Sequence, residues 1–305
     1  MQRRYVTVDV FTDRALGGNP LAVVLDSEGL STAQMQAIAT EFNYSETTFV
    51  LPPDDAANDA KVRIFTATSE IPFAGHPNVG TAYVLASRAS KQPERLKFEE
   101  LAGIVSVEIL AQHGKVTGAE LTAPERLNKL SSFSAEQAAS CLSLSAADIK
   151  LDQHPPRIFS VGLPFLIVEL TQREALRSAR PDAAAFARVL PTDGARSIYF
   201  YTRDVQPAEK PCDLQARMFL RGSSGLTEDP ATGSAAVAIA AVLADLAGEG
   251  NGEFKLLIGQ GFDMGRPSLL RTRVRKAGGA LVSAHVGGAC VSMMEGTFRL
   301  AGTGS

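Results

Sequence analysis

Two stretches of this sequence match each other: residues 70–86 are EIPFAGHPNVGTAYVLA and residues 228–244 are EDPATGSAAVAIAAVLA. Eight of the 17 aligned positions are identical, including the glutamate, proline and glycine of a Glu-x-Pro-x-x-Gly pattern. After the glycine both stretches become apolar, and Pro77 occupies a position that the first turn of a helix tolerates. Each stretch is therefore expected to be a turn followed by a helix that is apolar nearly all round and must be buried.

Other landmarks recur in the same order, 144 to 154 residues apart: GNPLAVV (18–24) with GLPFLIV (162–168), ETTFV (46–50) with SIYFY (197–201), and RIF (63–65) with RMF (217–219). These spacings are close to half of the 305 residues. The pattern predicts an internal duplication with two similar domains, residues 1–127 and 128–291. Each domain is expected to wrap strands around one of the two apolar helices.

Local signals agree with a mixture of strands and helices. Ser31 and Gln34 form a capping box before a run with helical spacing, so residues 31–42 are predicted to be a helix. A second helix is expected from Gly75 to about Ser87, followed by two strands and a turn-rich link over residues 124–132.

Composition excludes several classes of protein. Hydrophobic residues make up 45% of the chain and charged residues 21%, which is typical of a soluble globular protein. The net charge of −3 argues against nucleic acid as a partner. The longest apolar run, residues 235–244, is too short to span a membrane, which takes about 20 residues. The three widely spaced cysteines suit a reducing compartment, so a cytoplasmic location is expected.

The two glycine-led helix starts have two possible roles. If both face the interface between the domains, their free N–H groups form an anion site, which favours a small carboxylate as substrate. Alternatively, the glycines only allow helix and strand to pack closely. The pattern alone leaves both roles open.

The motifs NYSET (43–47), EIPFAGHP (70–77), EDPATGSA (228–235) and GRPS (265–268) resemble those of the PhzF (phenazine biosynthesis-like) family, as do VDVF (8–11) and GNP (18–20). The resemblance implies an α+β fold of the diaminopimelate-epimerase type. Such a fold has two pseudo-symmetric domains, each a mostly antiparallel barrel-like sheet around a central helix, with the active site between them. It also implies a homodimer, and it allows the last strand, about residues 292–305, to return to the first domain.

The activity defined in this family is the isomerisation of trans-2,3-dihydro-3-hydroxyanthranilate, a hydrogen shift that uses no cofactor. Carried over to the matching positions, the resemblance implies that Glu46 is the acid/base. It implies catalytic or substrate-holding roles for His76 and Asp229, and substrate binding by three further residues, Gly75, Gly233 and Ser234.

The chemistry is consistent with these residues, although each also has a plain structural interpretation. A single carboxylate can remove a proton from one carbon and return it to another, because abstraction turns it into the acid. Glu46 could equally be a surface glutamate of a strand. Asp229 precedes a proline and could be an ordinary helix N-cap, and His76 could also cap. Ser197, which aligns with Glu46, is not an acid, as expected for a one-base mechanism.

The cysteines bear on the nearest rival class. Diaminopimelate epimerases and proline racemases share the implied fold but use two thiols at the two helix starts, where no cysteine of this sequence lies. The four histidines are too dispersed to indicate a zinc site, and no motif implies a cofactor. The sequence therefore favours a cofactor-free isomerase acting on a small cyclic or unsaturated carboxylate. The alternatives are an epimerase or racemase acting on a small amino or hydroxy acid, and a non-catalytic binding protein.

Overall fold

The computed structural model describes residues 2–206, 212–222, 225–248 and 250–300. It divides into two compact units. Unit 1 comprises the chain up to Leu121 together with the segment that begins at Gly287, and unit 2 comprises Thr122–Val286. The last five residues of the strand expected at 292–305 lie outside the described part, and the rest of it belongs to unit 1.

Unit 1 contains nine strands and two helices in its described part. They are β1 (Gln2–Val10), β2 (Asn19–Val24), α1 (Thr32–Phe42), β3 (Glu46–Leu51), β4 (Ala60–Phe65), β5 (Glu70–Ile71), α2 (Gly75–Arg88), β6 (Arg95–Glu100), β7 (Gly103–Gln112), β8 (Lys115–Thr122) and the end of β17 (Ala280–Arg299). The helix predicted over residues 31–42 is confirmed as α1, including its capping box of Ser31 and Gln34.

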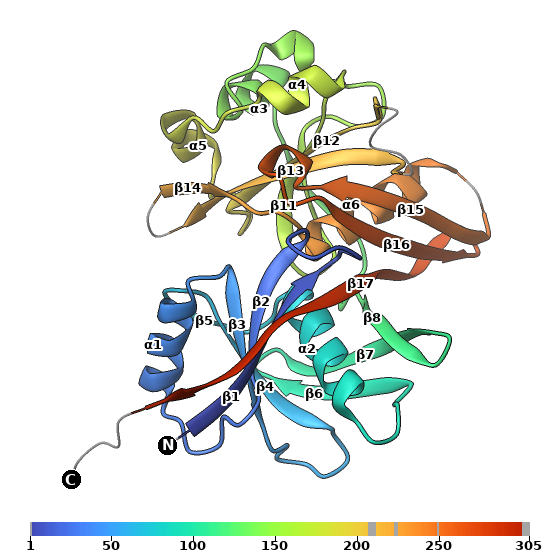
Figure 1. Cartoon of the computed structure of the whole chain (residues 1–305). Helices are drawn as coiled ribbons and strands as arrows, with labels where there is room; N and C mark the ends of the chain where they lie inside the picture. The colour runs from blue at the N-terminus through green and yellow to red at the C-terminus, as the bar shows by residue number, and fades with distance from the viewer. Residues whose placement is uncertain (1, 207–211, 223–224, 249, 301–305) are drawn as a thin grey trace. The chain divides into compact units, whose positions relative to one another are not determined.

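The strands of unit 1 close into a ring. The order of pairing is β1, β2, β3, β4, β6, β7, β8, β17 and back to β1, so each of these eight strands has a neighbour on both sides. Only β2–β3 and β4–β6 are described as parallel pairs. Figure 1 shows β17 following β1 along the unit. Closure removes the free edges that would otherwise invite pairing with another chain.

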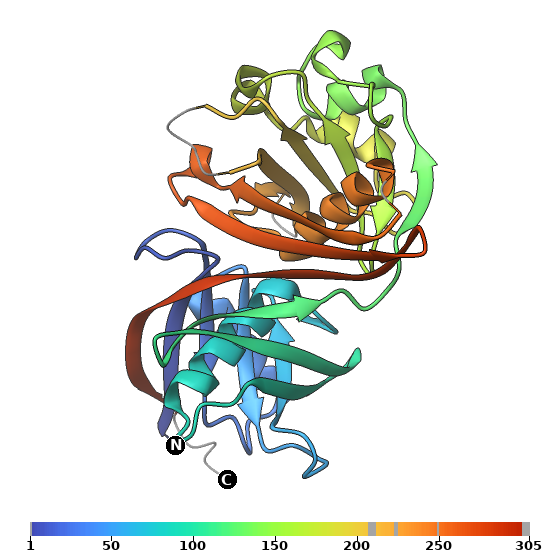
Figure 2. The same ribbon diagram turned by 90° about the vertical axis from the view of Figure 1, so that its right-hand side faces the viewer.

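The helix α2 lies at the centre of unit 1. Ten of its 14 residues are buried, because it contacts strands on several sides: β1, β2, β3 and β7. Figure 2 shows it running among these strands. Gly80 allows this packing, since a Cβ there would come within 2.6 Å of a Leu21 methyl group and 2.8 Å of a Val10 methyl group. The helix expected from Gly75 to about Ser87 is confirmed.

Unit 2 repeats this plan with additional helices. Its elements are β9 (Asn128–Ser132), α3 (Ala135–Cys141), the 3-10 turn η1 (Ala146–Asp148), β10 (Arg157–Ser160), β11 (Pro164–Glu169), α4 (Arg173–Ser178), α5 (Ala183–Val189), β12 (Ser197–Thr202), β13 (Leu214–Gly222), β14 (Gly225–Glu228), α6 (Gly233–Leu246), β15 (Gly252–Gln260), the 3-10 turn η3 (Phe262–Met264) and β16 (Ser268–Ala277). The central helix α6 packs on β10, β11, β15 and β16.

The strand registers confirm the duplication residue by residue. The parallel pair β11–β12 repeats β2–β3, and the parallel pair β13–β15 repeats β4–β6. Thr47 lies opposite Phe65 in unit 1, and Ile198 lies opposite Phe219 in unit 2. Glu46 and Ser197 each precede one of these residues, so they occupy equivalent positions. The predicted α+β architecture of mostly antiparallel sheets around central helices is confirmed.

Two details of the sequence prediction are wrong. Three strands follow α2, not two, and the link over residues 124–132 contains the strand β9. All five residues of β9 are exposed, so the alternation of buried and exposed side chains that identifies a strand is missing from its sequence.

Candidate active site

The residues predicted from unit 1 lie together at the start of α2. Glu46 is the first residue of β3, while Gly75 and His76 are the first two residues of α2. The Nε2 atom of His76 lies 3.4 Å from Oε2 of Glu46. His76 is only 6% exposed. The structure therefore places a carboxyl group and an imidazole side by side at a helix N-terminus.

The imidazole of His76 is neutral, because burial lowers its pKa to about 3. Its other nitrogen, Nδ1, lies 3.4 Å from Nδ2 of Asn19. An amide nitrogen can only donate, so Nδ1 is the acceptor and the ring proton is on Nε2, facing Glu46. The contact is thus a neutral N–H directed at a carboxyl group. At 3.4 Å it is longer than a formed hydrogen bond.

The turn before β2 explains why Asn19 reaches His76. Gly18 has a φ of +61°, and a Cβ at this position would collide with the carbonyl oxygen of Val10. Only glycine fits, and the residue after it is fully buried. The GNP motif at residues 18–20 therefore positions the amide that sets the tautomer of His76, a role that the sequence did not reveal.

In unit 2, Asp229 follows β14 and belongs to a buried hydrogen-bond network. The hydroxyl of Thr232 donates to Oδ2 of Asp229 at 2.5 Å. Gln260 donates through Nε2 to the Thr232 hydroxyl at 3.0 Å and to the Asp229 carbonyl oxygen at 2.8 Å, and its Oε1 accepts from the Thr232 amide at 3.0 Å. This network holds the turn that leads into α6.

The network also fixes the direction of each hydrogen bond. Both hydrogens of the Gln260 amide are used, and one of them occupies a lone pair of the Thr232 hydroxyl. That hydroxyl has a single hydrogen, which it gives to Asp229. A carboxylate is stabilised as an ion by such donation, so the arrangement favours the charged form of Asp229.

Two further residues shape the same turn. The Ser268 hydroxyl donates to the carbonyl oxygen of Pro230 at 3.0 Å. A Cβ at Gly261, whose φ is +76°, would lie 2.6 Å from that same oxygen. Ser268 thus gives the end of the GRPS motif a structural role. The Tyr199 side chain is fully buried, and both burial and the charge of Asp229 raise the pKa of its hydroxyl.

The helix starts correct the capping interpretations. The N-cap of α6 is Thr232 and the N-cap of α2 is Ala74, and neither side chain caps its helix. Asp229 lies three residues before the N-cap, and His76 is inside α2, so neither residue caps.

Gly233 and Ser234 are the first two residues of α6, as Gly75 and His76 are of α2. Backbone N–H groups of a first turn can bind an anion.

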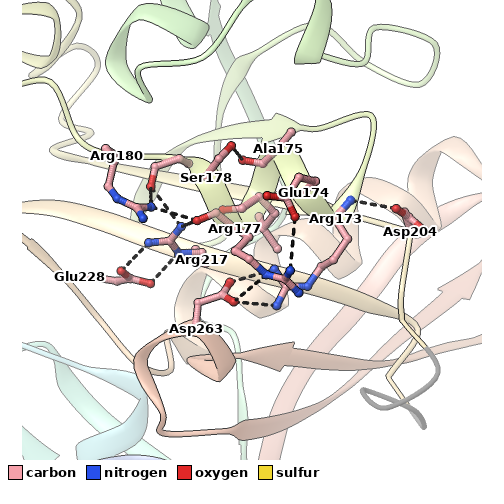
Figure 3. Close-up of polar contacts among 12 residues, drawn as sticks. Arg173, Glu174, Ala175, Arg177, Ser178, Arg180, Asp204, Arg217, Glu228 and Asp263 are labelled. Carbon is pink, nitrogen blue, oxygen red and sulfur yellow. Dashed lines mark hydrogen bonds and ion pairs between the residues drawn. The ribbon is translucent and has the colours of Figure 1, made fainter.

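Buried ion pairs hold the elements on either side of Asp229. Figure 3 shows Arg217 bonded to Glu228, the residue before Asp229. The two hydrogen bonds between them are 2.8 Å long, and Nη1 of Arg217 donates to the carbonyl oxygen of Leu176 at 2.7 Å. Arg173 makes two bonds of 2.9 Å to Asp263 in η3. Both arginines are nearly fully buried, so β14 and η3 are each fastened to α4.

None of the three cysteines belongs to the first turn of α2 or α6: Cys141 ends α3, Cys212 precedes β13, and Cys290 is in β17. Burial raises the thiol pKa of Cys141 to about 11 and that of Cys290 to about 12. These two thiols are therefore poor nucleophiles or bases at neutral pH.

Within the described residues, no cluster of three or more His, Cys, Asp or Glu side chains could hold a metal ion. The same residues include no helix long and apolar enough to cross a membrane.

A duplicated strand-and-helix scaffold with polar groups at two helix starts defines the epimerase-like class of α+β proteins. The model of the phenazine biosynthesis-like protein family matches residues 8–296, and this chain belongs to that family.

Individual relatives agree with this assignment. An uncharacterized isomerase of Mesorhizobium japonicum is 38% identical, with 96% of this chain and 98% of the relative covered. The trans-2,3-dihydro-3-hydroxyanthranilate isomerase of Pseudomonas chlororaphis is 36% identical, with 97% and 99% covered. The crystal structure of a PhzF-family protein of Bacillus anthracis has the same fold, with a TM-score of 0.87, 24% identity, and 98% and 100% covered. The chain is an isomerase of this family.

Proposed function

We propose that this isomerase moves a proton within a small cyclic or unsaturated carboxylate, of the dihydro-hydroxyanthranilate kind, without a cofactor. The observation that carries the proposal is the pair formed by the buried neutral His76 and Glu46. A carboxylate beside a fixed N–H donor can act first as base and then as acid, because the donor stabilises the ionised form with which the cycle begins and to which it returns once the proton has been delivered.

The roles follow from the protonation states. Glu46 removes a proton from one carbon of the substrate and returns it to another. His76 directs its Nε2 proton at the Glu46 carboxyl and is neutral throughout, since its pKa of about 3 lies far below neutral pH. Asp229, which accepts from Thr232, binds a substrate ammonium or hydroxyl group.

The helix starts are assigned to the substrate carboxylate. In this proposal the N–H groups at Gly75, Gly233 and Ser234 donate to it, and none of these groups is blocked by a capping side chain from the N-cap residue.

The expectations of a homodimer and of a cytoplasmic location belong to the same proposal. Sedimentation analysis of the purified protein and fractionation of its cells would test them.

The test uses trans-2,3-dihydro-3-hydroxyanthranilate as the probe, in deuterated buffer, followed by NMR. The wild-type protein is expected to shift the hydrogen within the ring. Glu46→Gln should lower turnover at least about 100-fold, the smaller end of the range for general acid–base catalysis. Glu41→Gln, the same chemical change on the exposed side of α1, serves as the control.

Undiminished turnover by Glu46→Gln would overturn the assignment of the base. Exchange of an α-proton with inversion at that carbon, measured on small amino and hydroxy acids, would favour an epimerase instead. Binding of the probe without any exchange would indicate a non-catalytic relative.

A further inference from the structure

The duplication places two polar residues at equivalent strand ends. In unit 2, Leu214 of β13 pairs in parallel with Ile258 of β15, and in unit 1, Ala60 of β4 pairs in parallel with Phe98 of β6. Two residues after Ile258, β15 ends at Gln260. Two residues after Phe98, β6 ends at Glu100. Glu100 is therefore the counterpart of Gln260.

Gln260 shows what this position does. Its amide is fully buried and makes three hydrogen bonds to the turn before α6, two as donor and one as acceptor. A neutral group with both a donor and an acceptor is required there. A carboxylate could not replace it, because an ionised carboxyl group has only acceptors.

Glu100 lies in the corresponding place in unit 1. The turn after it is joined to the turn before α2 by a hydrogen bond of 3.2 Å from the Ala102 amide to the Pro72 carbonyl oxygen. Both carboxyl oxygens of Glu100 are buried, and neither has a hydrogen bond of good geometry to the described residues. Burial raises the pKa of Glu100 to about 8, while the Asn78 amide in the first turns of α2 acts in the opposite direction.

We propose that Glu100, in its protonated form, is a positioning residue that supports the turn leading to Gly75 and His76, as Gln260 supports the turn leading to Gly233 and Ser234. A protonated carboxyl group has nearly the shape of an amide and, like it, both donates and accepts. Ionisation removes the donor and leaves a buried charge, so the turn must rearrange or admit water.

The charged groups around Glu100 are committed elsewhere. Glu99 accepts from Asn58 and from the backbone of residues 54 and 55. On β4, Lys61 pairs with Asp54. On α2, burial keeps His76 neutral, and Arg88 pairs with Glu295. The carboxyl of Glu100 is therefore the group whose titration alters the support of this turn.

A stability measurement tests the inference without any substrate. The native state retains the Glu100 proton up to about pH 8, while the unfolded state releases it near the ordinary value of 4.5. The native state thus binds more protons between these values, and the free energy of unfolding falls as pH rises through this range. Glu100→Gln removes this fall, so its melting temperature should increasingly exceed that of the wild type from pH 5 to pH 8. Glu99→Gln is the control, because hydrogen bonds from Asn58 and from the backbone of residues 54 and 55 lower the pKa of this half-buried carboxyl. The difference between Glu99→Gln and the wild type should stay constant between pH 6 and pH 8.

The activity arm rests on the proposed function. Wild-type turnover of the probe should decline as pH rises above 8, and Glu100→Gln should retain its turnover there. Glu100→Ala, which leaves the turn without support, should lose about 10-fold at every pH, and Gln at this position should recover most of that loss. A wild type without isomerase activity would contradict the proposed function and leave the stability arm intact. A melting-temperature difference between Glu100→Gln and the wild type that does not change with pH would overturn the inference about Glu100.

Discussion

Units 1 and 2 retain the same framework but carry different polar groups. Arg63 bonds to Glu70 in unit 1 through two contacts of 2.6 and 2.7 Å, and Arg217 bonds to Glu228 in unit 2 in the same way. At three other equivalent positions the residues differ: Glu46 with Ser197, His76 with Ser234, and Glu100 with Gln260. The proposed base Glu46 and its neighbour His76 lie in unit 1, and the equivalent positions of unit 2 hold serines.

The difference shows which parts of the duplicated sequence the fold requires. The arginine–glutamate pair ties a long strand to the short strand that leads into the central helix, so it is needed in both units. The residues at the helix starts contribute little to that connection and could diverge. In the proposed mechanism, the duplicated fold therefore carries the proton-transfer group in unit 1 and binding groups in unit 2.

The largest expected effect concerns the two arginines. Arg217 has a side chain that is 7% exposed and also binds carbonyl oxygens at the end of α4, whereas the side chain of Arg63 is 21% exposed. Arg217→Met should lower the free energy of unfolding by about 3–5 kcal/mol, since it leaves buried carbonyl oxygens of α4 as well as the half-buried Glu228 without their partner. Arg63→Met should cost about 1 kcal/mol. Urea unfolding of both variants checks this, and equal losses would mean that the two pairs are equally important.

The second effect concerns the donor to Asp229. Unit 1 has Ala74 at the position of Thr232, so this hydrogen bond is specific to unit 2. Thr232→Val retains the shape but loses the hydroxyl, and a bond to a charged group contributes about 1.5–3 kcal/mol. Turnover of the probe should fall about 10-fold or more. Thr232→Ser retains the hydroxyl and should stay near wild type. Undiminished turnover by Thr232→Val would show that the role assigned to the hydroxyl is wrong.

The smallest effect is a change in the pH dependence of stability. His76 has its pKa lowered to about 3, while the unfolded state takes up a proton near 6.5. The unfolded state binds more protons between these values, so stability rises with pH across that range. His76→Asn should flatten this part of the curve, and replacement of the exposed His113 by Asn should not. Melting temperatures at intervals from pH 4 to pH 7 provide the measurement. A curve for His76→Asn as steep as that of the wild type would show that His76 is protonated in the folded protein.

The sequence predicted features that depend on local rules. The capping box of Ser31 and Gln34, the helix from Gly75 and the order of the repeats all follow from short patterns, and they are confirmed. It also placed Glu46 and His76 in one group through the family resemblance. Their proximity could not be derived from spacing, because β3 and α2 are brought together only by the ring of strands.

The sequence missed residues whose role depends on burial at a strand end. Gln260 and Glu100 belong to none of the motifs that were recognised, and Asn19 was noticed only as part of GNP. Extending the repeat along the parallel strands would have aligned Gln260 with Glu100, 160 residues apart, and identified both as candidates. Asp229 was open to interpretation as a cap because Asp before proline often is one; here the helix starts four residues later.

The closed ring of unit 1 also has a consequence for the order of events during synthesis. Its final member, β17, spans Ala280–Arg299, while its partner β1 begins at Gln2. During translation, β1 and β8 each have an unsatisfied edge until nearly all of the chain has left the ribosome, and such edges are prone to mispairing. Unit 2, which is translated later, can therefore complete its fold before unit 1 does. Nascent chains arrested before residue 287 should accordingly show a protease-resistant unit 2 and a protease-sensitive unit 1.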